Sequence, residues 1–317
     1  MCIGGLNMRE LPFIKMHGCG NDYIYFDCLN DTMHNQMLPV WQLCHRRTGI
    51  GGDGIVLILP SDIADARMRM FNSQDGTESA MCGNALPCVA KYLYDHGIVS
   101  KEQIKIETKS GVKELSLIIK DGKTVAVRVD MGPASLKPEE IPVNLTGEAI
   151  ISQPITIGSA THKVTCVSMG NPHAVVFTVG MKELGEVELA TVDLETVGPL
   201  FENDPLFPER VNLAFTHVLS RNHLRVRIWE RGSGETWGSG TGACAAAIAA
   251  ILNGYGDKDS DILVEMPGGE LTIRYTGQTV YMTGNCVEVY KGVVNLTPVT
   301  NNEYIDDKTT KPRKQVL

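Results

Sequence analysis

The chain has 317 residues and a net charge of −8, and its 43% hydrophobic and 21% charged residues are typical of a soluble globular protein. This length is enough for two ordinary domains with cores of their own. The negative charge argues against a nucleic-acid partner, because the one Lys/Arg-rich piece, residues 308–314, lies in a polar tail. No apolar run approaches the roughly 20 residues of a membrane span, and residues 1–11 do not resemble a signal peptide.

The cysteine content indicates a reducing compartment. Nine cysteines are spaced irregularly along a long chain, which is not the pattern of a disulfide-rich secreted protein. The sequence contains no CxxC pair, so we expect no zinc site or other metal site. We therefore expect a cytoplasmic protein that does not associate with a membrane.

The first half of the chain is expected to begin with a hairpin over residues 13–27, whose glycine turn is suited to carry function. Residues 38–47 have helical spacing. The glycines of residues 49–54 match G-x-G-x-x-G, but a strand follows where a dinucleotide site needs a helix, so we do not interpret them as a nucleotide site. Further strands are predicted at 55–59, 67–72, 104–108, 112–119 and 125–131, with a helix between 82 and 97.

The second half repeats this order. Strands are predicted at 163–168, 174–179, 211–215, 224–229, 262–266, 270–275 and 280–283, and a helix follows residue 239. Each half has a Gly-Asn turn early, a helix that starts with small residues in the middle, and a strand that ends in glycine late. This pattern indicates an internal duplication. Residues 297–317 are polar, and we expect them to be disordered.

One stretch, residues 230–244, carries the strongest local signal. A charged pair is followed by a glycine-rich turn and then by an alanine run, which predicts a loop that leads into the N-terminus of a buried helix. Free backbone N–H groups and the helix dipole favour an anion at such a point. A weaker copy occupies residues 81–94, and Cys82 and Ser239 take the same place in the two copies, just before a glycine.

Two such helix ends that face one cleft would form a carboxylate site. A cysteine at a helix N-terminus has a lowered pKa, so the Cys82 thiolate could remove the α-proton of a bound amino acid as a general base. A second acid–base group on the opposite face could return a proton with inverted configuration. The pattern therefore points to a racemase or epimerase that needs no cofactor.

Four motifs carry a resemblance to a known family. Residues 16–22, 82–84, 169–173 and 230–236 occur in the order found in the diaminopimelate epimerase family, and the resemblance covers residues 13–296. It implies an α/β fold of two similar, pseudo-symmetric lobes, each a strand-rich barrel around a central helix, with the active site in the cleft between them. The N-terminal lobe would comprise residues 9–131 plus 286–296, the last of these forming a strand that returns to it, and the C-terminal lobe residues 132–285.

The resemblance also implies an activity. It is the epimerisation of LL- to meso-diaminopimelate by 1,1-proton transfer, a step of lysine and peptidoglycan biosynthesis, carried out without cofactor by a homodimer. Cys82, Ser239, Glu230 and His173 would be the catalytic residues, and Asn21 would line the reacting centre with them. Gly83, Asn84, Gly240 and Thr241 would hold the α-carboxylate, and Asn72, Asn171, Asn212 and Arg231 the distal amino and carboxylate groups. Arginine suits a carboxylate because its fork binds both oxygens, and asparagine offers both donors and an acceptor.

Ser239 departs from the family, which has its second catalytic cysteine at this position. A hydroxyl is a much weaker acid than a thiol, so we expect the serine form to be inactive or impaired. Three interpretations remain open: an engineered replacement that stops turnover, a natural member that exchanges or eliminates from one face only, and a protein that binds amino acids without catalysis. A racemase for another amino acid, such as histidine, is a further alternative.

Two of the carried-over roles also have simpler alternatives. His173 could stabilise its turn without taking part in catalysis. Glu230 and Arg231 could form a surface ion pair, which typically contributes only about 0–1 kcal/mol to stability.

Overall fold

A computed structural model describes residues 9–30, 38–73, 75–79, 83–178 and 189–296. Cys82 and the predicted tail, residues 297–317, lie outside the described residues. Within this part of the chain, no helix is both long and apolar enough to cross a membrane.

The first half of the chain contains eight strands and two helices in the described residues. They are β1 (Arg9–Gly18), β2 (Asn21–Asp27), α1 (Val40–Cys44), β3 (Gly54–Leu59), β4 (Ala66–Asn72), β5 (Glu78–Ser79), α2 (Ala85–Asp95), β6 (Gln103–Thr108), β7 (Gly111–Lys120) and β8 (Lys123–Gly132).

The rest of the described chain adds ten strands and two α-helices. They are β9 (Gln153–Ile157), β10 (Ala160–Ser168), β11 (Pro172–Phe177), α3 (Leu194–Glu202), β12 (Asn212–Ser220), β13 (His223–Glu230), β14 (Gly234–Thr236), α4 (Gly240–Leu252), β15 (Asp261–Met266), β16 (Gly269–Tyr275), β17 (Val280–Gly284) and β18 (Val287–Leu296). The fold is thus a strand-rich mixed α/β fold.

Strand pairing follows the same sequence of directions in the two halves. In the first half β1–β2 is antiparallel, β2–β3 parallel, β3–β4 antiparallel, β4–β6 parallel, and β6–β7 and β7–β8 antiparallel. In the second half β10–β11, β11–β12, β12–β13, β13–β15, β15–β16 and β16–β17 repeat these directions in the same order. The topology therefore repeats within the chain, as the duplicated sequence pattern predicted.

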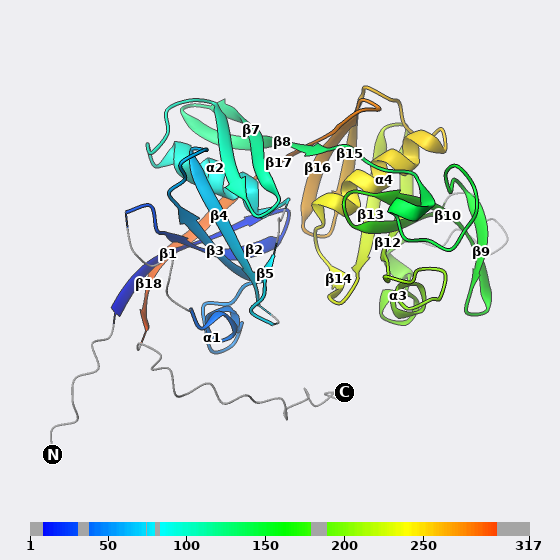
Figure 1. Cartoon of the computed structure of the whole chain (residues 1–317), viewed down its shortest axis with the longest axis horizontal. Coiled ribbons are helices and arrows are strands. Elements are labelled where there is room, and N and C mark those ends of the chain that lie inside the picture. Colours follow the sequence, from blue (N-terminus) through cyan, green and yellow to red (C-terminus); the bar gives the residue numbers. More distant parts are fainter. Residues whose placement is uncertain (1–8, 31–37, 74, 80–82, 179–188, 297–317) are drawn as a thin grey trace, which may run out of the picture.

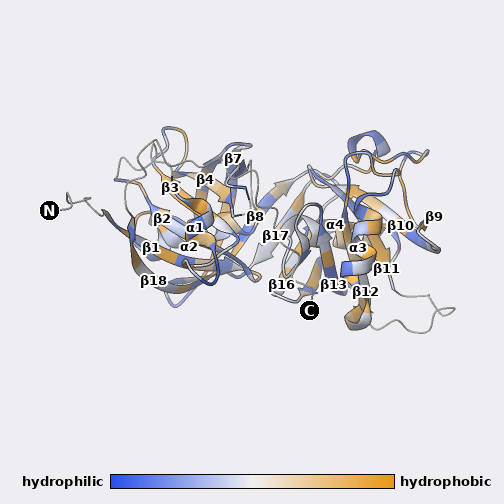
Figure 2. Cartoon of the chain, turned by 90° about the horizontal axis from the view of Figure 1, so that it is seen from below, coloured by the Kyte–Doolittle hydropathy of each residue, from blue (hydrophilic) through white to orange (hydrophobic). Residues whose placement is uncertain are grey.

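Each half is arranged around one helix, α2 or α4, as Figure 1 shows. Each helix is the crossover between two parallel strands, β4 and β6 or β13 and β15, a connection that needs a dozen or more residues. From residue 242 to residue 250 every residue of α4 is buried, because its alanine-rich sequence is apolar on all sides. One hydrophobic cluster holds the buried side chains of both helices, and apolar colour marks much of the inner strands in Figure 2.

Two strand pairs tie distant parts of the chain together. β8 pairs with β17 and thereby joins the two halves in one sheet. β18 returns to pair antiparallel with β1 along almost its whole length, as the family resemblance implied. The predicted lobe boundaries stay a prediction.

Most predicted strands are present, and their ends lie within one to three residues of the predicted ends. The helix predicted at 38–47 is shorter than expected. Only Val40–Cys44 is helical, because His45 adopts an extended conformation. The backbone N–H groups of Gly51 and Gly52 then donate to the carbonyls of Leu43 and Cys44, so the chain folds back on the helix end. β5, β9 and β14 were not predicted.

Candidate active site

The N-termini of α2 and α4 lie side by side. A Cβ added to Gly240, the first residue of α4, would lie 3.3 Å from Oδ1 of Asn84, the residue before α2. Such a Cβ would also meet Met282, and a Cβ on Gly83 would lie 3.7 Å from the Met282 methyl. The two helix ends are thus separated by little more than one methionine side chain, and each of them attracts negative charge.

Asn84 connects the two halves at this point. Its Nδ2 lies 3.4 Å from Oδ1 of Asn21 and 3.4 Å from the carbonyl oxygen of Gly238, which directly precedes Ser239. The Asn84 side chain is 4% exposed and makes no cap bond to its own helix. Its amide nitrogen therefore joins Asn21, of the first half, to the turn before α4.

A charged network holds Asn21 in place. Its Nδ2 donates to Asp53 at 2.7 Å, and its Oδ1 accepts from the Tyr23 hydroxyl at 2.9 Å. Arg46 binds both Asp53 and Asp22, at 2.8 and 2.6 Å. Burial raises the pKa of Asp22, but hydrogen bonds from Arg46 and from the buried Lys15 outweigh this effect and hold the pKa at about 2. These bonds fix the orientation of the Asn21 amide, with its nitrogen towards Asp53 and its oxygen towards Tyr23.

Ser239 is the N-cap of α4, and its Oγ accepts a bond from the Gly242 N–H at 3.3 Å. Its side chain also hydrogen-bonds to the Glu230 carboxylate. The Thr236 hydroxyl donates to the same carboxylate at 2.7 Å. Burial raises the pKa of Glu230, while the hydrogen bonds from Thr236 and Ser239 work against this rise. Glu230 is therefore a largely buried carboxyl group linked directly to Ser239, and within the described residues it forms no ion pair with Arg231.

His173, on β11, is fully buried. Burial, assisted by the nearby Arg231 charge, lowers the pKa of His173 to about 3, so the ring is neutral at pH 7. Asn171 Nδ2 lies 3.3 Å from Thr241 Oγ1, which leaves Asn171 Oδ1 to accept from His173 Nε2 at 3.0 Å. The proton then resides on Nε2, and Nδ1 is a buried acceptor that makes no bond within the described chain.

Asn212 and Arg231 lie together beside this group. Asn212 Nδ2 donates to the Pro172 carbonyl at 2.9 Å, and its Oδ1 accepts from the Arg231 backbone N–H at 2.9 Å. The Arg231 guanidinium donates to the Glu209 carbonyl at 2.8 Å. Among the described residues, no carboxylate forms an ion pair with the Arg231 guanidinium.

Two of the predicted site residues do not join this arrangement. Cys82 lies outside the described residues. Asn72 bonds within its own hairpin, to the Thr77 hydroxyl at 3.3 Å, and no bond of the described chain connects it to the other site residues. The remaining predicted residues, from Asn21 to Thr241, gather at the two helix N-termini.

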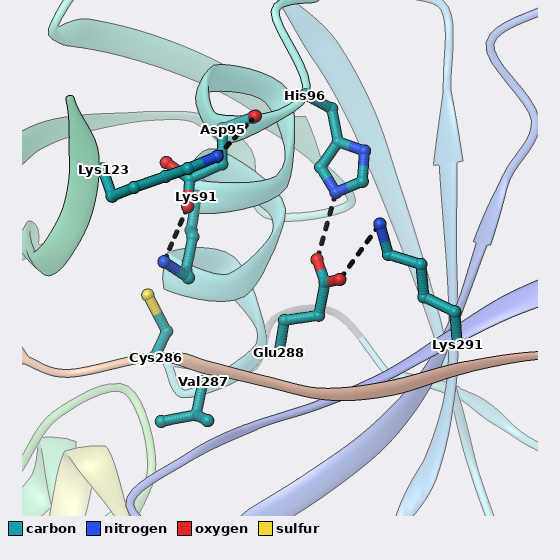
Figure 3. A pocket seen from close by; sticks show the side chains of 8 residues that line it. All are labelled: Lys91, Asp95, His96, Lys123, Cys286, Val287, Glu288 and Lys291. Carbon is teal, nitrogen blue, oxygen red and sulfur yellow. Dashed lines mark hydrogen bonds and ion pairs between the residues drawn. The ribbon is translucent and has the colours of Figure 1, made fainter.

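Two surface cavities lie elsewhere. One, of about 470 Å³, is at the C-terminal end of α2, where Lys91, Asp95 and His96 face residues of β18 (Figure 3). Most of its charged groups are already engaged: Lys91 binds Asp95, and Glu288 is shared by His96 and Lys291. Lys123 donates to the Asp95 backbone carbonyl. The second, of about 530 Å³, adjoins it and shares His96 and Lys291. The α2 side chains that line them, from Lys91 onwards, belong to the C-terminal half of the helix and not to the end that carries the candidate site.

Sequence reasoning missed three residues of the site: Asp53, Thr236 and Met282. Asp53 lies in the glycine-rich segment 49–54, which we set aside once it failed as a nucleotide site. Thr236 was inside a motif, yet nothing in the sequence linked it to Glu230. Met282 is an ordinary apolar residue of a strand, and no signal identifies it.

Comparison with known proteins assigns the family. A family model described as diaminopimelate epimerase matches residues 13–137 and 165–289, two segments that correspond to the two halves of the fold. A diaminopimelate epimerase of Acetivibrio thermocellus is 47% identical over 288 residues, which cover 90% of this chain and 99% of the relative. One of Agathobacter rectalis is 45% identical over 295 residues, covering 90% of this chain and all of the relative.

Solved structures share the fold at low sequence identity. A phenazine biosynthesis protein of the PhzF family from Bacillus anthracis has a TM-score of 0.65 and 16% identity, over 91% of this chain and 100% of the other. A hydroxyproline epimerase from Agrobacterium vitis has a TM-score of 0.63 and 17% identity, over 91% and 93%. With a family model that matches most of its length and relatives near 45% identity, the chain belongs to the diaminopimelate epimerase family.

Proposed function

We propose that this chain is an epimerase that inverts the α-carbon of diaminopimelate by 1,1-proton transfer, without a cofactor. The observation that carries the proposal is the meeting of two helix N-termini at Asn84 and Gly240, beside a buried carboxyl–hydroxyl pair. We propose further that each half is a lobe built as a barrel around its helix, over residues 9–131 plus 286–296 and 132–285, with the active site between the lobes.

The α-carboxylate of the substrate would bind at the two helix ends. The first N–H groups of a helix have no partner within it, and those of Gly83, Asn84, Gly240 and Thr241 belong to these two ends. Removing an α-proton leaves a carbanion whose charge spreads onto the adjacent carboxylate. The helix ends would therefore stabilise the transition state more than the substrate, which is the condition for catalysis.

Proton transfer needs one group on each face of the α-carbon. Cys82 would act on one face: its thiolate takes the α-proton, so that a C–H bond breaks and an S–H bond forms. On the other face the Ser239 hydroxyl would give its proton to the carbanion, and a protonated Glu230 would return a proton to the serine oxygen. The raised pKa of Glu230 supports this role, because a buried carboxyl keeps its proton more readily. His173, neutral and with an Nδ1 acceptor that makes no bond within the described residues, would orient groups near the α-carbon.

The distal end of the substrate distinguishes the candidate amino acids. Arg231 forms no ion pair within the described chain, and Asn171 and Asn212 offer amide groups for a second amino-acid head. Asn72, which no bond of the described chain connects to these residues, stays a prediction for this end of the substrate. A distal carboxylate would complete this set, and diaminopimelate has one. Histidine and lysine do not, which makes a racemase for either of them the less favoured alternative.

A substrate panel tests this assignment. The protein is incubated separately with LL-diaminopimelate, L-lysine and L-histidine, and the stereoisomers are separated by chiral chromatography. We expect inversion of diaminopimelate at a rate at least tenfold above the other two. Inversion of histidine at an equal or greater rate would refute the substrate assignment while leaving the two-base chemistry intact.

We also propose that the chain works as a homodimer in the cytoplasm. β18 exposes Val289 and Val293, at 52% and 58%, with Tyr290 beside them at 44%. Three large apolar side chains on one strand are suited to an interface with a second copy. Light scattering should give twice the chain mass, and Val293→Lys should shift it towards the monomer.

A further inference from the structure

The turn at the tip of the first hairpin lies directly on the backbone of the second half. Cys19 and Gly20 connect β1 to β2, and both have positive φ angles, 52° and 75°, which is the geometry of a type I′ turn. Burial, and then the charge of Glu270, raise the pKa of the Cys19 thiol to about 12, so the side chain packs as a neutral group.

The backbone against which this turn packs includes two glycines, Gly238 and Gly268. A Cβ on Gly238 or on Gly268 would lie far closer to the Cys19 carbonyl than 3.0 Å, a separation below which real Cβ atoms essentially never fall. A Cβ on Gly20 would lie 2.8 Å from the Gly268 Cα. The obstacle in each case is backbone, which cannot rotate away as a side chain can. At neither Gly238 nor Gly268 is φ positive, so backbone conformation alone does not require glycine there.

This contact lies at the centre of the candidate active site. Asn21 follows the turn directly, and Ser239 follows Gly238 directly. Asn84 reaches both sides of the contact, since its amide lies 3.4 Å from Asn21 and 3.4 Å from the Gly238 carbonyl. Any movement of Cys19 away from Gly238 would therefore also separate Asn21 and the start of α2 from Ser239.

We propose that Gly238 and Gly268 are positioning residues that form a seat for the Cys19 carbonyl and so set the spacing between the two catalytic halves. The lack of a side chain at each glycine lets the two backbones approach until the helix ends of α2 and α4 meet. A methyl group would hold the halves apart by a distance on the order of 1 Å, and a displacement of that size can cost about 100-fold in rate. The proposal rests on the proposed function for its kinetic readout only.

The test compares Gly238→Ala and Gly268→Ala with Gly49→Ala. A Cβ on Gly49 would meet backbone carbonyls of Gln42 and Leu43 just as closely, but this contact lies wholly within the first half. The control therefore carries the same kind of steric clash without one between the halves. All three variants are measured for thermal stability and for kcat and KM with LL-diaminopimelate.

A structural readout keeps the test independent of activity. The Trp237 side chain is 68% exposed and its Cβ lies beside the seat, so its fluorescence should report a change in spacing. Trp41, 64% exposed, is replaced by Phe in every protein to remove its signal. The buried Trp229 remains in all of them.

The expected result is specific to the seat. Gly238→Ala and Gly268→Ala should lower kcat/KM about 100-fold and shift the Trp237 emission. Gly49→Ala should lower thermal stability but leave the Trp237 emission unchanged. Unchanged emission in both seat variants would overturn the proposal, whether or not the protein turns over diaminopimelate. A loss of kcat/KM in the two seat variants that is no greater than the loss in Gly49→Ala would also overturn the proposal. If the parent protein inverts no diaminopimelate, the proposed function fails. The Trp237 emission alone then tests whether Gly238 and Gly268 set the spacing between the halves.

Discussion

Replacing Ser239 by cysteine should raise activity and lower stability at the same time. The change substitutes a thiol, whose ordinary pKa is about 8.5, for a hydroxyl that is a far weaker acid. A well-matched general acid–base group contributes about 10²–10⁴ in rate, or roughly 3–5 kcal/mol of barrier. We therefore expect Ser239→Cys to increase kcat for LL-diaminopimelate by at least about 100-fold.

The cost in stability follows from the helix cap. Ser239 Oγ accepts from the Gly242 N–H at 3.3 Å, longer than an ordinary N–H···O bond of about 2.9–3.0 Å. Loss of an N-cap bond costs about 0.5–2 kcal/mol, and a bond this long should fall in the lower part of that range. A sulfur accepts only weakly, so Ser239→Cys should be less stable by about 0.5–1 kcal/mol in urea unfolding.

Ser239→Ala is the matched control, because it removes the cap bond and offers no proton. It should lose stability to a similar extent and lose the remaining activity. Rates are measured by conversion of LL- to meso-diaminopimelate, and stabilities by urea unfolding followed by circular dichroism. Ser239 has no role in proton transfer if Ser239→Cys is no faster than the serine form, or if Ser239→Ala inverts substrate as fast as the serine form.

Three further predictions concern other residues of the site. Glu230→Gln should lower kcat by about 100-fold in the serine form with little change in KM, because it removes the proton source behind Ser239; steady-state kinetics check this. The pKa of His173 is lowered from 6.5 to about 3 in the folded protein. Between about pH 6.5 and 3, the unfolded chain therefore carries a proton on this histidine that the folded protein does not. Stability should fall by about 1.4 kcal/mol per pH unit as pH drops through this window, and the slope should be smaller in His173→Gln; urea unfolding from pH 7 to 4 measures both. Asn84→Ala should raise KM at least tenfold, because it removes a group at the carboxylate site and the link between Asn21 and Gly238; equal KM values would contradict this role.

The parts of the fold that the sequence predicted are those with strong local patterns. The alanine run after Ser239 predicted α4, because a helix that is apolar on all sides must be buried. The hairpin at the start and the paired strands of each half followed from apolar runs and glycine turns. The duplicated order of motifs predicted the repeated topology, since the same local signals recur at similar spacing.

The parts that could not be predicted depend on contacts between distant residues. Asp53 and Asn21 are 32 residues apart, and nothing local indicates that their side chains meet. The buried Lys15 stands in an apolar strand, and its partners within the described residues are Asp22 and the Gly51 carbonyl. Gly238 was taken for an ordinary turn glycine, because its role depends on the Cys19 carbonyl from the other half.

The most direct test of the central claim is deuterium incorporation during epimerisation. LL-diaminopimelate is incubated in heavy water with the serine form and with Ser239→Cys, and the α-hydrogens of substrate and product are followed by NMR. We predict that deuterium appears in meso-diaminopimelate before it appears in the remaining LL-isomer, because one group removes the proton and a different one supplies its replacement. Inversion should be slow in the serine form and faster in the cysteine form. Incorporation into neither isomer by either protein would contradict the claim and leave amino-acid binding without catalysis as the function.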